Sequence, residues 1–409
     1  MSILSKSAYG KVLKNDVLAL SQEAKKAKQK DNSVVNATIG SLYDDNGKFY
    51  VFEHVNKLIK NLPNEDFYSY SPNNGNANFH KAVTKWVFGD FYENVLNNMT
   101  CESIPTPGGT GAVSNGLYNS LDAGETLILP DIYWGPYKNM ADSNGFKVLE
   151  YKFIVDGKYN IQGFIDACEQ VIKKQGKVVT ILNDPCNNPT GYSLSEEEFA
   201  AVIDYMNSKK DALFNMIYDI AYFDYYSCGN IQARKKFDLM VKSNENILYN
   251  IAFSCSKTFS VYGLRLGAQI ILSKNKEFVK EIYDSTCFLA RTRWSNVSKA
   301  GLSMMIEIDN NEEVRNEIIK EINEAVEVVN KRAELFVSEA KECGLEIYPY
   351  SGGFFITAIC ENGIELAEKL KSEGIFVLGF KKAVRIAICS VPLFELKGVA
   401  QKIKNCLNK

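Results

Sequence analysis

Short apolar runs alternate with amphipathic helical patterns through the middle of the chain, and this alternation restricts the possible folds most. The runs are rich in β-branched and aromatic residues and occupy residues 126–129, 177–182, 214–219, 247–253 and 267–272. Between two of them, residues 195–210 have helical periodicity, and Ser195 with Glu198 forms a capping box at their start. Strands that alternate with helices are typical of α/β proteins. The sequence therefore predicts an α/β fold around a mainly parallel sheet.

A second unit is predicted after this region. From residue 312 to 343 the apolar residues recur every three or four positions, and Gly344 ends the pattern, which indicates one long amphipathic helix. Shorter strand-like and helical segments follow it. We therefore expect a large α/β domain over residues 51–310 and a smaller α+β domain that combines residues 1–50 with residues 311–409.

The composition excludes several classes of function. The formal net charge of −2 gives no basic field for nucleic acid, and no apolar run is long enough to span a membrane. His54 and His80 are the only histidines, which disfavours histidine-based hydrolysis and histidine-rich metal sites, and we predict no metal. The ten cysteines form no C-x-x-C pair, and reduced, scattered thiols favour a cytoplasmic protein.

Polar residues follow three of the predicted strands, at the end of a sheet where α/β proteins bind ligands. They are Asn188, Asp219, Tyr222 and Lys257. Upstream, TPGGTGAVSNGL (106–117) is a glycine turn that opens a helix, and free N–H groups there suit a phosphate. A lysine that can bond to an aldehyde, an aspartate, an anion cradle and Arg265 together indicate pyridoxal phosphate chemistry. Singly, Lys257 could be a solvated surface lysine, and Arg265 could pair with a structural carboxylate.

Five motifs at matching spacing carry a resemblance to a known family. They are TPGGTGA, NNPTG, DIAYFDY, SCSKTFSVYGLRLG and VRIAI. Together they resemble the class I aminotransferases, the fold type I pyridoxal-phosphate family that includes aspartate and aromatic aminotransferases. Residues 36–52 and 290–296 are also similar to segments of that family, so the resemblance covers nearly the whole chain.

The resemblance implies a role for each motif residue. Lys257 would bond to the cofactor and move the substrate proton, and Asp219 would hold the pyridine nitrogen protonated. Tyr222 and Asn188 would hydrogen-bond the phenolic oxygen of the ring, and Trp134 would stack on its face. The residues implied to bind the phosphate are Gly109, Thr110, Ser254, Arg265 and, from a neighbouring subunit, Tyr70. Tyr68 is the alternative to Tyr70.

The implied substrates are an amino acid and a 2-oxo acid, with aspartate or an aromatic amino acid as donor and 2-oxoglutarate as the expected acceptor. Arg385 would bind the α-carboxylate, in a pocket lined by the backbone at Gly40 together with Trp134 and Asn188. Arg291 would bind a distal carboxylate across the interface of a homodimer. Arg293 is its competitor, since residues two apart on an extended segment face the same side.

The sequence departs from the family pattern at two positions behind Asp219. Tyr137 and Asn183 stand where relatives often have histidines, so the partners of the Asp219 carboxylate are open. Two other functions also remain open. One is a β-eliminating lyase on the same scaffold, and the other is a non-enzymatic cofactor-binding regulator, which the lack of a basic DNA-binding segment disfavours.

Overall fold

The computed structural model describes residues 2–5, 7–12 and 17–408. A seven-stranded sheet forms the centre of the larger unit, in the order β2-β10-β9-β8-β7-β3-β4. Its strands are β2 (Thr100–Thr106), β3 (Thr126–Pro130), β4 (Lys147–Tyr151), β7 (Lys177–Asn183), β8 (Leu213–Asp219), β9 (Ile247–Ser254) and β10 (Gly267–Ser273). β10 is antiparallel to both neighbours, and the other pairs are parallel. The α/β fold and its mainly parallel sheet are therefore confirmed.

The five predicted strands are the five inner strands of this sheet, and the structure places each within one residue of its predicted bounds. Every residue of β9 is buried, as a strand covered on both faces requires, and this explains its continuous apolar sequence. The sequence analysis did not identify β2 and β4. Both are edge strands and carry partly exposed polar residues, so their sequences lack the apolar run of an inner strand.

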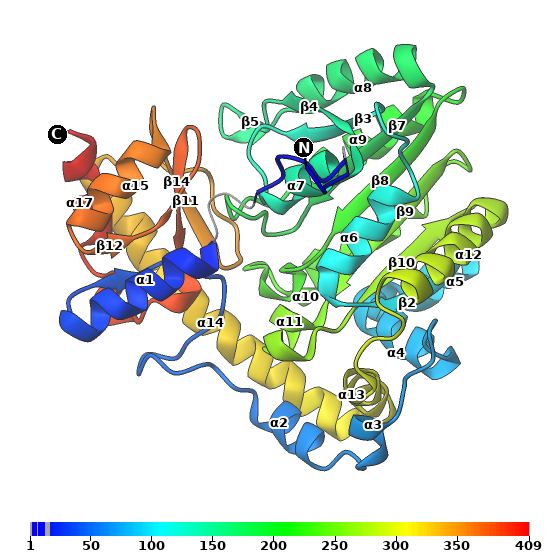
Figure 1. Cartoon of the computed structure of the whole chain (residues 1–409), viewed down its shortest axis with the longest axis horizontal. Helices are drawn as coiled ribbons and strands as arrows, with labels where there is room; N and C mark the ends of the chain where they lie inside the picture. Colours follow the sequence, from blue (N-terminus) through cyan, green and yellow to red (C-terminus); the bar gives the residue numbers. More distant parts are fainter. Residues whose placement is uncertain (1, 6, 13–16, 409) are drawn as a thin grey trace.

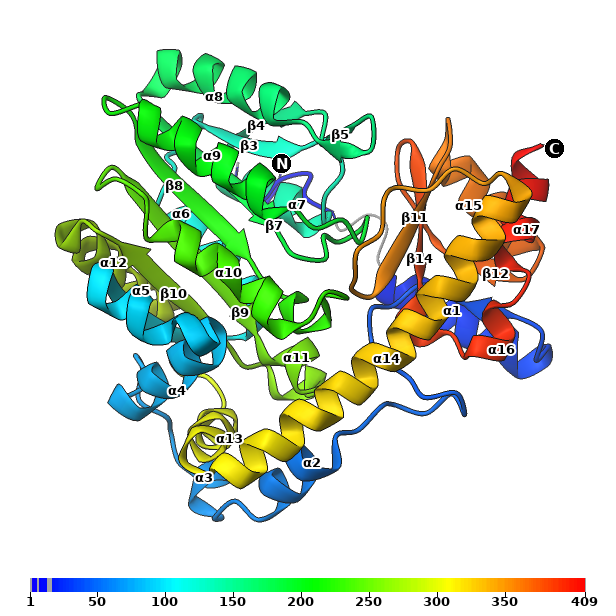
Figure 2. The ribbon, with the colours of Figure 1, turned by 180° about the vertical axis from the view of Figure 1, so that it is seen from behind.

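Helices cover both faces of the sheet. Figure 1 shows α6, α7 and α12 on one face, and Figure 2, from behind, shows α8, α9 and α10 on the other. The helices of this unit are α4 (Ala77–Phe88), α5 (Tyr92–Asn98), α6 (Gly108–Tyr118), α7 (Pro136–Asn144), α8 (Ile161–Gln175), α9 (Glu196–Ser208), α10 (Asn230–Met240), α11 (Cys255–Thr258), α12 (Lys276–Arg293) and α13 (Lys299–Asn310). The predicted capping box is present at the start of α9, where Ser195 and Glu198 satisfy each other's backbone N–H groups.

The smaller unit contains a three-stranded sheet, β11-β14-β13, and the parallel pair β1-β12. Its elements are α1 (Val17–Lys30), β1 (Val35–Asn36), β11 (Phe355–Ile359), α15 (Gly363–Ser372), β12 (Ile375–Phe376), β13 (Leu378–Gly379), β14 (Ala383–Ala387), α16 (Leu393–Leu396) and α17 (Val399–Leu407). The pairing of β1 with β12 joins the amino-terminal segment to this unit. The division into residues 51–310 and residues 1–50 with 311–409 stays a prediction.

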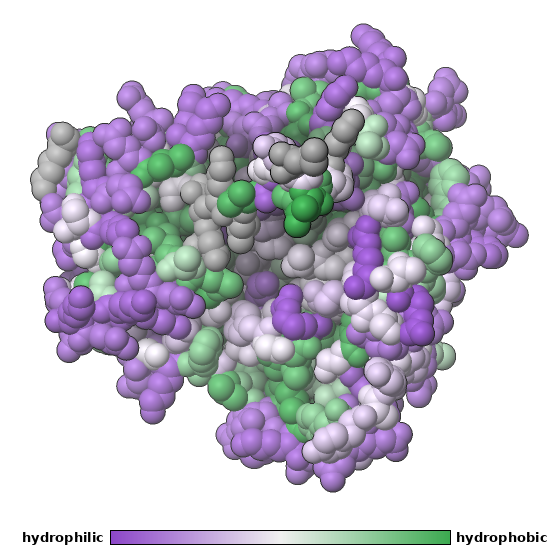
Figure 3. Space-filling model, viewed as in Figure 1, coloured by the Kyte–Doolittle hydropathy of each residue, from purple (hydrophilic) through white to green (hydrophobic). Residues whose placement is uncertain are grey.

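A single helix links the two units. α14 (Glu312–Cys343) runs from beside α2 (Glu53–Lys60) and α13 into the smaller unit, as Figure 2 shows. Gly344 ends it in the left-handed conformation, at φ +68°, which confirms the predicted helix and its stop. On the face drawn in Figure 3, hydrophilic residues form most of the outer rim and apolar residues gather mostly inside it. No helix in the described part of the chain is long and apolar enough to cross a membrane.

Candidate active site

The carboxyl ends of β7, β8 and β9 bring the predicted residues to one small cavity. Its volume is about 70 Å³. It is lined by Gly109, Thr110, Trp134, Tyr137, Asn183, Asn188, Asp219, Ala221, Tyr222, Ser254, Lys257 and Arg265. Adjacent parallel strands end at the same edge of a sheet, so residues far apart in sequence meet here. Nine of the predicted site residues therefore lie together: Gly109, Thr110, Trp134, Asn188, Asp219, Tyr222, Ser254, Lys257 and Arg265.

Lys257 lies in the short helix α11 directly after β9. Burial lowers the pKa of its amine, while the negative charge of Asp219 acts in the opposite direction. Its Nζ lies 5.6 Å from the centre of the Tyr222 ring. A lysine with a lowered pKa has a larger neutral fraction at a given pH, and the neutral amine is the form that attacks an aldehyde. The alternative interpretation of Lys257 as a solvated surface lysine is therefore wrong.

Tyr137 is the partner of the Asp219 carboxylate. Its hydroxyl donates a hydrogen bond of 2.6 Å to Asp219 Oδ2, and the backbone N–H of Ala221 donates one of 3.0 Å to Oδ1. Asn183 instead donates from its side chain to the backbone carbonyl of Asp219, at 2.8 Å. Burial raises the pKa of Asp219, and the hydrogen bond from Tyr137 works against that rise. Tyr137, one of the two departures from the family pattern, is therefore the side-chain donor to the Asp219 carboxylate.

The start of α6 and Arg265 form a cradle suited to an anion. No side chain caps α6, and the first N–H groups of a helix have no partner within it. Gly108 has φ +70°, and a Cβ on it would lie 2.6 Å from Arg265 Nη2. Arg265 donates to Ser256 Oγ at 3.1 Å and, within the described residues, forms no ion pair. Sequence reasoning missed Gly108 and Ser256, although the double glycine of TPGGTGA indicates a close backbone approach.

Arg385 lies on β14 of the smaller unit and is 4% exposed. Its Nη1 donates to Asn188 Oδ1 at 3.0 Å and its Nη2 to the Thr38 carbonyl at 2.6 Å. Its Nε is buried without a hydrogen-bond partner among the described residues, where it also lacks a carboxylate. Burial lowers its pKa to about 10, so the guanidinium is still charged at neutral pH. A buried guanidinium without a carboxylate partner can bind a ligand carboxylate through two parallel hydrogen bonds.

Gly40 contributes space to the substrate pocket. A Cβ on it would lie 2.5 Å from Cζ of Phe355, and the Phe355 ring in turn lies 4.1 Å from the Arg385 guanidinium. Any side chain at position 40 would therefore displace this ring. The backbone group that contacts Arg385 is the Thr38 carbonyl, two residues before the predicted position.

Tyr70 and Arg291 lie outside the Lys257 cavity. Tyr70 is 89% exposed and Tyr68 87%, so exposure does not decide between them, but Tyr70 lines a second cavity of about 280 Å³ with Trp294, Ser295 and Asn296. The roles of Tyr70 and Arg291 toward a neighbouring subunit stay predictions.

The expectation that Arg291 and Arg293 face the same side is wrong. Both belong to α12, and residues two apart on a helix point in different directions. Arg291 donates to Ser295 Oγ at 2.7 Å, whereas the Arg293 guanidinium lies 4.3 Å from the centre of the Tyr118 ring. Both side chains thus contact their own chain, and the assignment of a distal carboxylate to Arg291 stays a prediction.

This arrangement defines a pyridoxal-phosphate-binding site on an aminotransferase fold, and comparison with known proteins agrees. The aminotransferase class I and II family matches residues 32–403. An aminotransferase structure from Anaerococcus prevotii has 31% identity and a TM-score of 0.94, over 100% of both chains. An aromatic-amino-acid aminotransferase from Burkholderia pseudomallei, covalently bound to pyridoxal phosphate, has 21% identity and a TM-score of 0.80, over 99% of this chain and 100% of that one.

Among curated proteins, the aromatic-amino-acid aminotransferase of Pseudomonas aeruginosa is 25% identical over 250 residues, which is 60% of this chain and 60% of that enzyme. The chain belongs to the class I and II aminotransferases. It is a pyridoxal-phosphate-dependent enzyme of that family, and the predicted family, enzyme class and cofactor are confirmed.

Replacing Tyr137 by phenylalanine tests the hydrogen bond from its hydroxyl to the Asp219 carboxylate. A hydrogen bond to a charged group contributes about 1.5–3 kcal/mol, so Tyr137→Phe should weaken pyridoxal phosphate binding about 10- to 150-fold. Without this donor the pKa of Asp219 rises further. The loss of cofactor affinity should therefore grow as the pH falls, because a larger fraction of the Asp219 carboxyl group is protonated. Fluorescence titration of the apoenzyme with the cofactor at several pH values measures this. Tyr133→Phe is the matched control, since Tyr133 bonds Glu150 at the surface.

Proposed function

We propose that the protein transfers the amino group of aspartate, an aromatic amino acid or both to a 2-oxo acid, with 2-oxoglutarate as the expected acceptor. The observation that carries this proposal is that Lys257 and Asp219 line one cavity, and that Arg385 donates a hydrogen bond to Asn188, which lines the same cavity. Pyridoxal phosphate, when bound, supplies an electron-withdrawing ring. Lys257 then moves the proton of the substrate Cα, and Arg385 fixes the α-carboxylate beside it.

Around these groups the other residues orient the reactants. Asp219 would bind the protonated pyridine nitrogen, and Tyr222 and Asn188 would hydrogen-bond the phenolic oxygen of the ring. Asn188 also accepts a hydrogen bond from Arg385, so one amide connects the cofactor side of the pocket to the substrate side. The helix start at Gly109 and Thr110, with Ser254 and Arg265, would hold the phosphate, and Trp134 would cover the ring.

The proposed assembly is a homodimer in which Tyr70 and Arg291 reach the neighbouring site. Support comes from the exposed aromatic surface that would face a second copy: the exposed fractions of Phe67, Tyr70 and Phe288 are 51%, 89% and 69%. Exposed patches of this kind mark interaction surfaces. A cytoplasmic location also stays a prediction, compatible with ten unpaired cysteines.

The reaction is tested by incubating the holoenzyme with a panel of amino donors, with and without 2-oxoglutarate. Transamination requires that the oxo acid of the donor forms only when an acceptor is present, with glutamate formed in equal amount. Release of ammonia and a 2-oxo acid without any acceptor would instead identify the β-eliminating lyase, and no turnover of any donor would favour the regulator.

Arg291→Ala tests the proposed recognition of a distal carboxylate. Removing one partner of a desolvated charge pair costs about 2–5 kcal/mol, so kcat/KM for aspartate and glutamate should fall roughly 30- to 5000-fold. An aromatic monocarboxylate donor should be nearly unaffected in its own half-reaction, measured by single-turnover absorbance. Arg293→Ala is the control. It should leave the ratio of kcat/KM between dicarboxylate and aromatic donors unchanged, because Arg293 packs on Tyr118. Equal losses for both donor classes would refute the assignment.

A further inference from the structure

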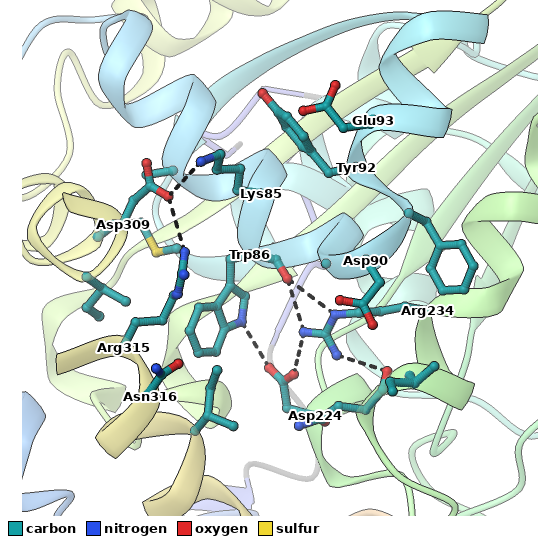
Figure 4. Close-up of a pocket in the computed structure, with 18 residues that line it drawn as sticks. Lys85, Trp86, Asp90, Tyr92, Glu93, Asp224, Arg234, Asp309, Arg315 and Asn316 are labelled. Atoms are coloured by element: carbon teal, nitrogen blue, oxygen red, sulfur yellow. Dashed lines mark hydrogen bonds and ion pairs between the residues drawn. The ribbon is translucent and has the colours of Figure 1, made fainter. Parts of the chain in front are cut away.

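A cavity larger than the one at Lys257 lies elsewhere in the structure. Its volume is about 480 Å³, and its lining residues come mainly from α4, α5, α10, α13 and α14 (Figure 4). None of the residues proposed for the reaction lines this cavity. A cavity of this size is within the range that holds small metabolites.

One end of this cavity carries an excess of positive charge. Three cations surround Asp309, which is almost fully buried: Lys85 and Arg315 line the cavity, and Lys81 lies outside it. Each lies 3.9 Å from an Asp309 oxygen, which is longer than a hydrogen bond. The side chains of Lys85 and Arg315 make no hydrogen bond within the described part of the chain, so their N–H groups are available to an incoming acceptor. Glu312, 4.0 Å from Arg315, is 80% exposed.

The rest of the wall is largely apolar. Trp86, Met305, Ile308 and Ile319 line it, and Figure 4 places the Trp86 indole between Arg315 and Arg234. Asp90, Glu93 and Asp224 also line the cavity, so the cations around Asp309 are the part of it that suits an anionic group. A guanidinium above an apolar surface suits a carboxylate that carries an apolar body.

A short chain of hydrogen bonds joins this cavity to the catalytic lysine. Asp224, which is 2% exposed, accepts from Trp86 Nε1 at 3.3 Å, from Arg234 Nη2 at 2.8 Å and from Thr258 Oγ1 at 2.8 Å. Thr258 directly follows Lys257 in α11. A ligand that moves Trp86 or Arg234 therefore acts on a group one residue from Lys257.

We propose that this cavity is a second binding site for small carboxylates with an apolar body, and that its occupation changes the environment of Lys257 through Asp224 and Thr258. The binding part is independent of the reaction. The coupling part rests on the proposed function, because it is observed at the cofactor bound by Lys257.

Calorimetric titration of the holoenzyme with phenylacetate, which has no amino or oxo group to react, tests the binding part. Arg385→Ala removes the carboxylate site of the active centre and should leave this second site. In that background, Arg315→Ala should weaken binding about 10- to 150-fold, as the loss of a charge-assisted hydrogen bond predicts. Lys81→Ala is the matched control: it also lies 3.9 Å from Asp309 but does not line the cavity, so its effect should stay within about twofold.

If Arg385→Ala does not fold, the wild-type holoenzyme serves, and it should show two binding events of which Arg315→Ala removes one. No binding beyond the event that Arg385 controls, or equal binding with and without Arg315, would overturn the site. For the coupling, phenylacetate should shift the pH titration of the visible cofactor absorption. Thr258→Val should abolish that shift and retain phenylacetate binding, whereas an unchanged shift would overturn the pathway. Calorimetry needs no turnover, so a failure of the proposed reaction would be recognised separately.

Discussion

Lys257→Ala should reduce the transamination rate by about 10⁴-fold or more. General acid–base catalysis by one positioned group contributes about 10²- to 10⁴-fold, and this variant loses the covalent attachment of the cofactor as well. The holoenzyme should show a visible absorption band that the variant lacks. Borohydride should fix the cofactor on Lys257 in the wild-type protein, where mass spectrometry of a digest locates it.

Lys257→Arg is the control for this prediction. It keeps a cation in the same buried place but cannot bond to the cofactor aldehyde, so it should be as inactive as the alanine variant. Pyridoxal phosphate should still bind to both variants without a covalent bond, because Arg265 and the start of α6 are intact. Borohydride labelling of a different active-site lysine in either variant would disprove the assignment of Lys257.

Arg385→Ala should lower kcat/KM for every amino acid and 2-oxo acid, roughly 30- to 5000-fold. The substrate α-carboxylate loses its partner, and Asn188 and the Thr38 carbonyl lose the donor that joins them. In contrast to Arg291→Ala, the loss should be similar for dicarboxylate and aromatic donors, because all of them carry an α-carboxylate. Steady-state kinetics with one donor of each class measures it.

Arg385→Lys separates charge from geometry. A lysine keeps the positive charge but cannot present two parallel N–H groups, so most of the loss should remain. Thermal unfolding of both variants shows whether the fold survives. A lysine variant with wild-type kcat/KM would mean that Arg385 acts only through its charge, and selective loss of dicarboxylates alone would move the distal-carboxylate role from Arg291 to Arg385.

Much of the fold and the central part of the site follow from the sequence. The inner strands are recognised because a strand buried on both faces needs a continuous apolar run, and α14 because its apolar stripe repeats at helical spacing. Lys257 and Asp219 are found because the carboxyl ends of adjacent parallel strands must meet. The strand and helix patterns are local in the sequence. The meeting of the strand ends follows from the parallel topology, which the alternation of strands and helices predicts.

Contacts between distant segments depended on the tertiary structure alone. The sequence named Tyr137 and Asn183 but not their roles: only the docking of α7 beside β8 brings the Tyr137 hydroxyl to the Asp219 carboxylate and leaves Asn183 to its backbone. That Arg291 and Arg293 do not face the same side became clear only because α12 continues as a helix through Arg293. The cavity of about 480 Å³ likewise exists only where α4, α5, α10, α13 and α14 meet, and Asp224 reaches Thr258 across 34 positions of the sequence. No periodicity or motif encodes such contacts, because side-chain pairing at this range is set by how whole elements pack.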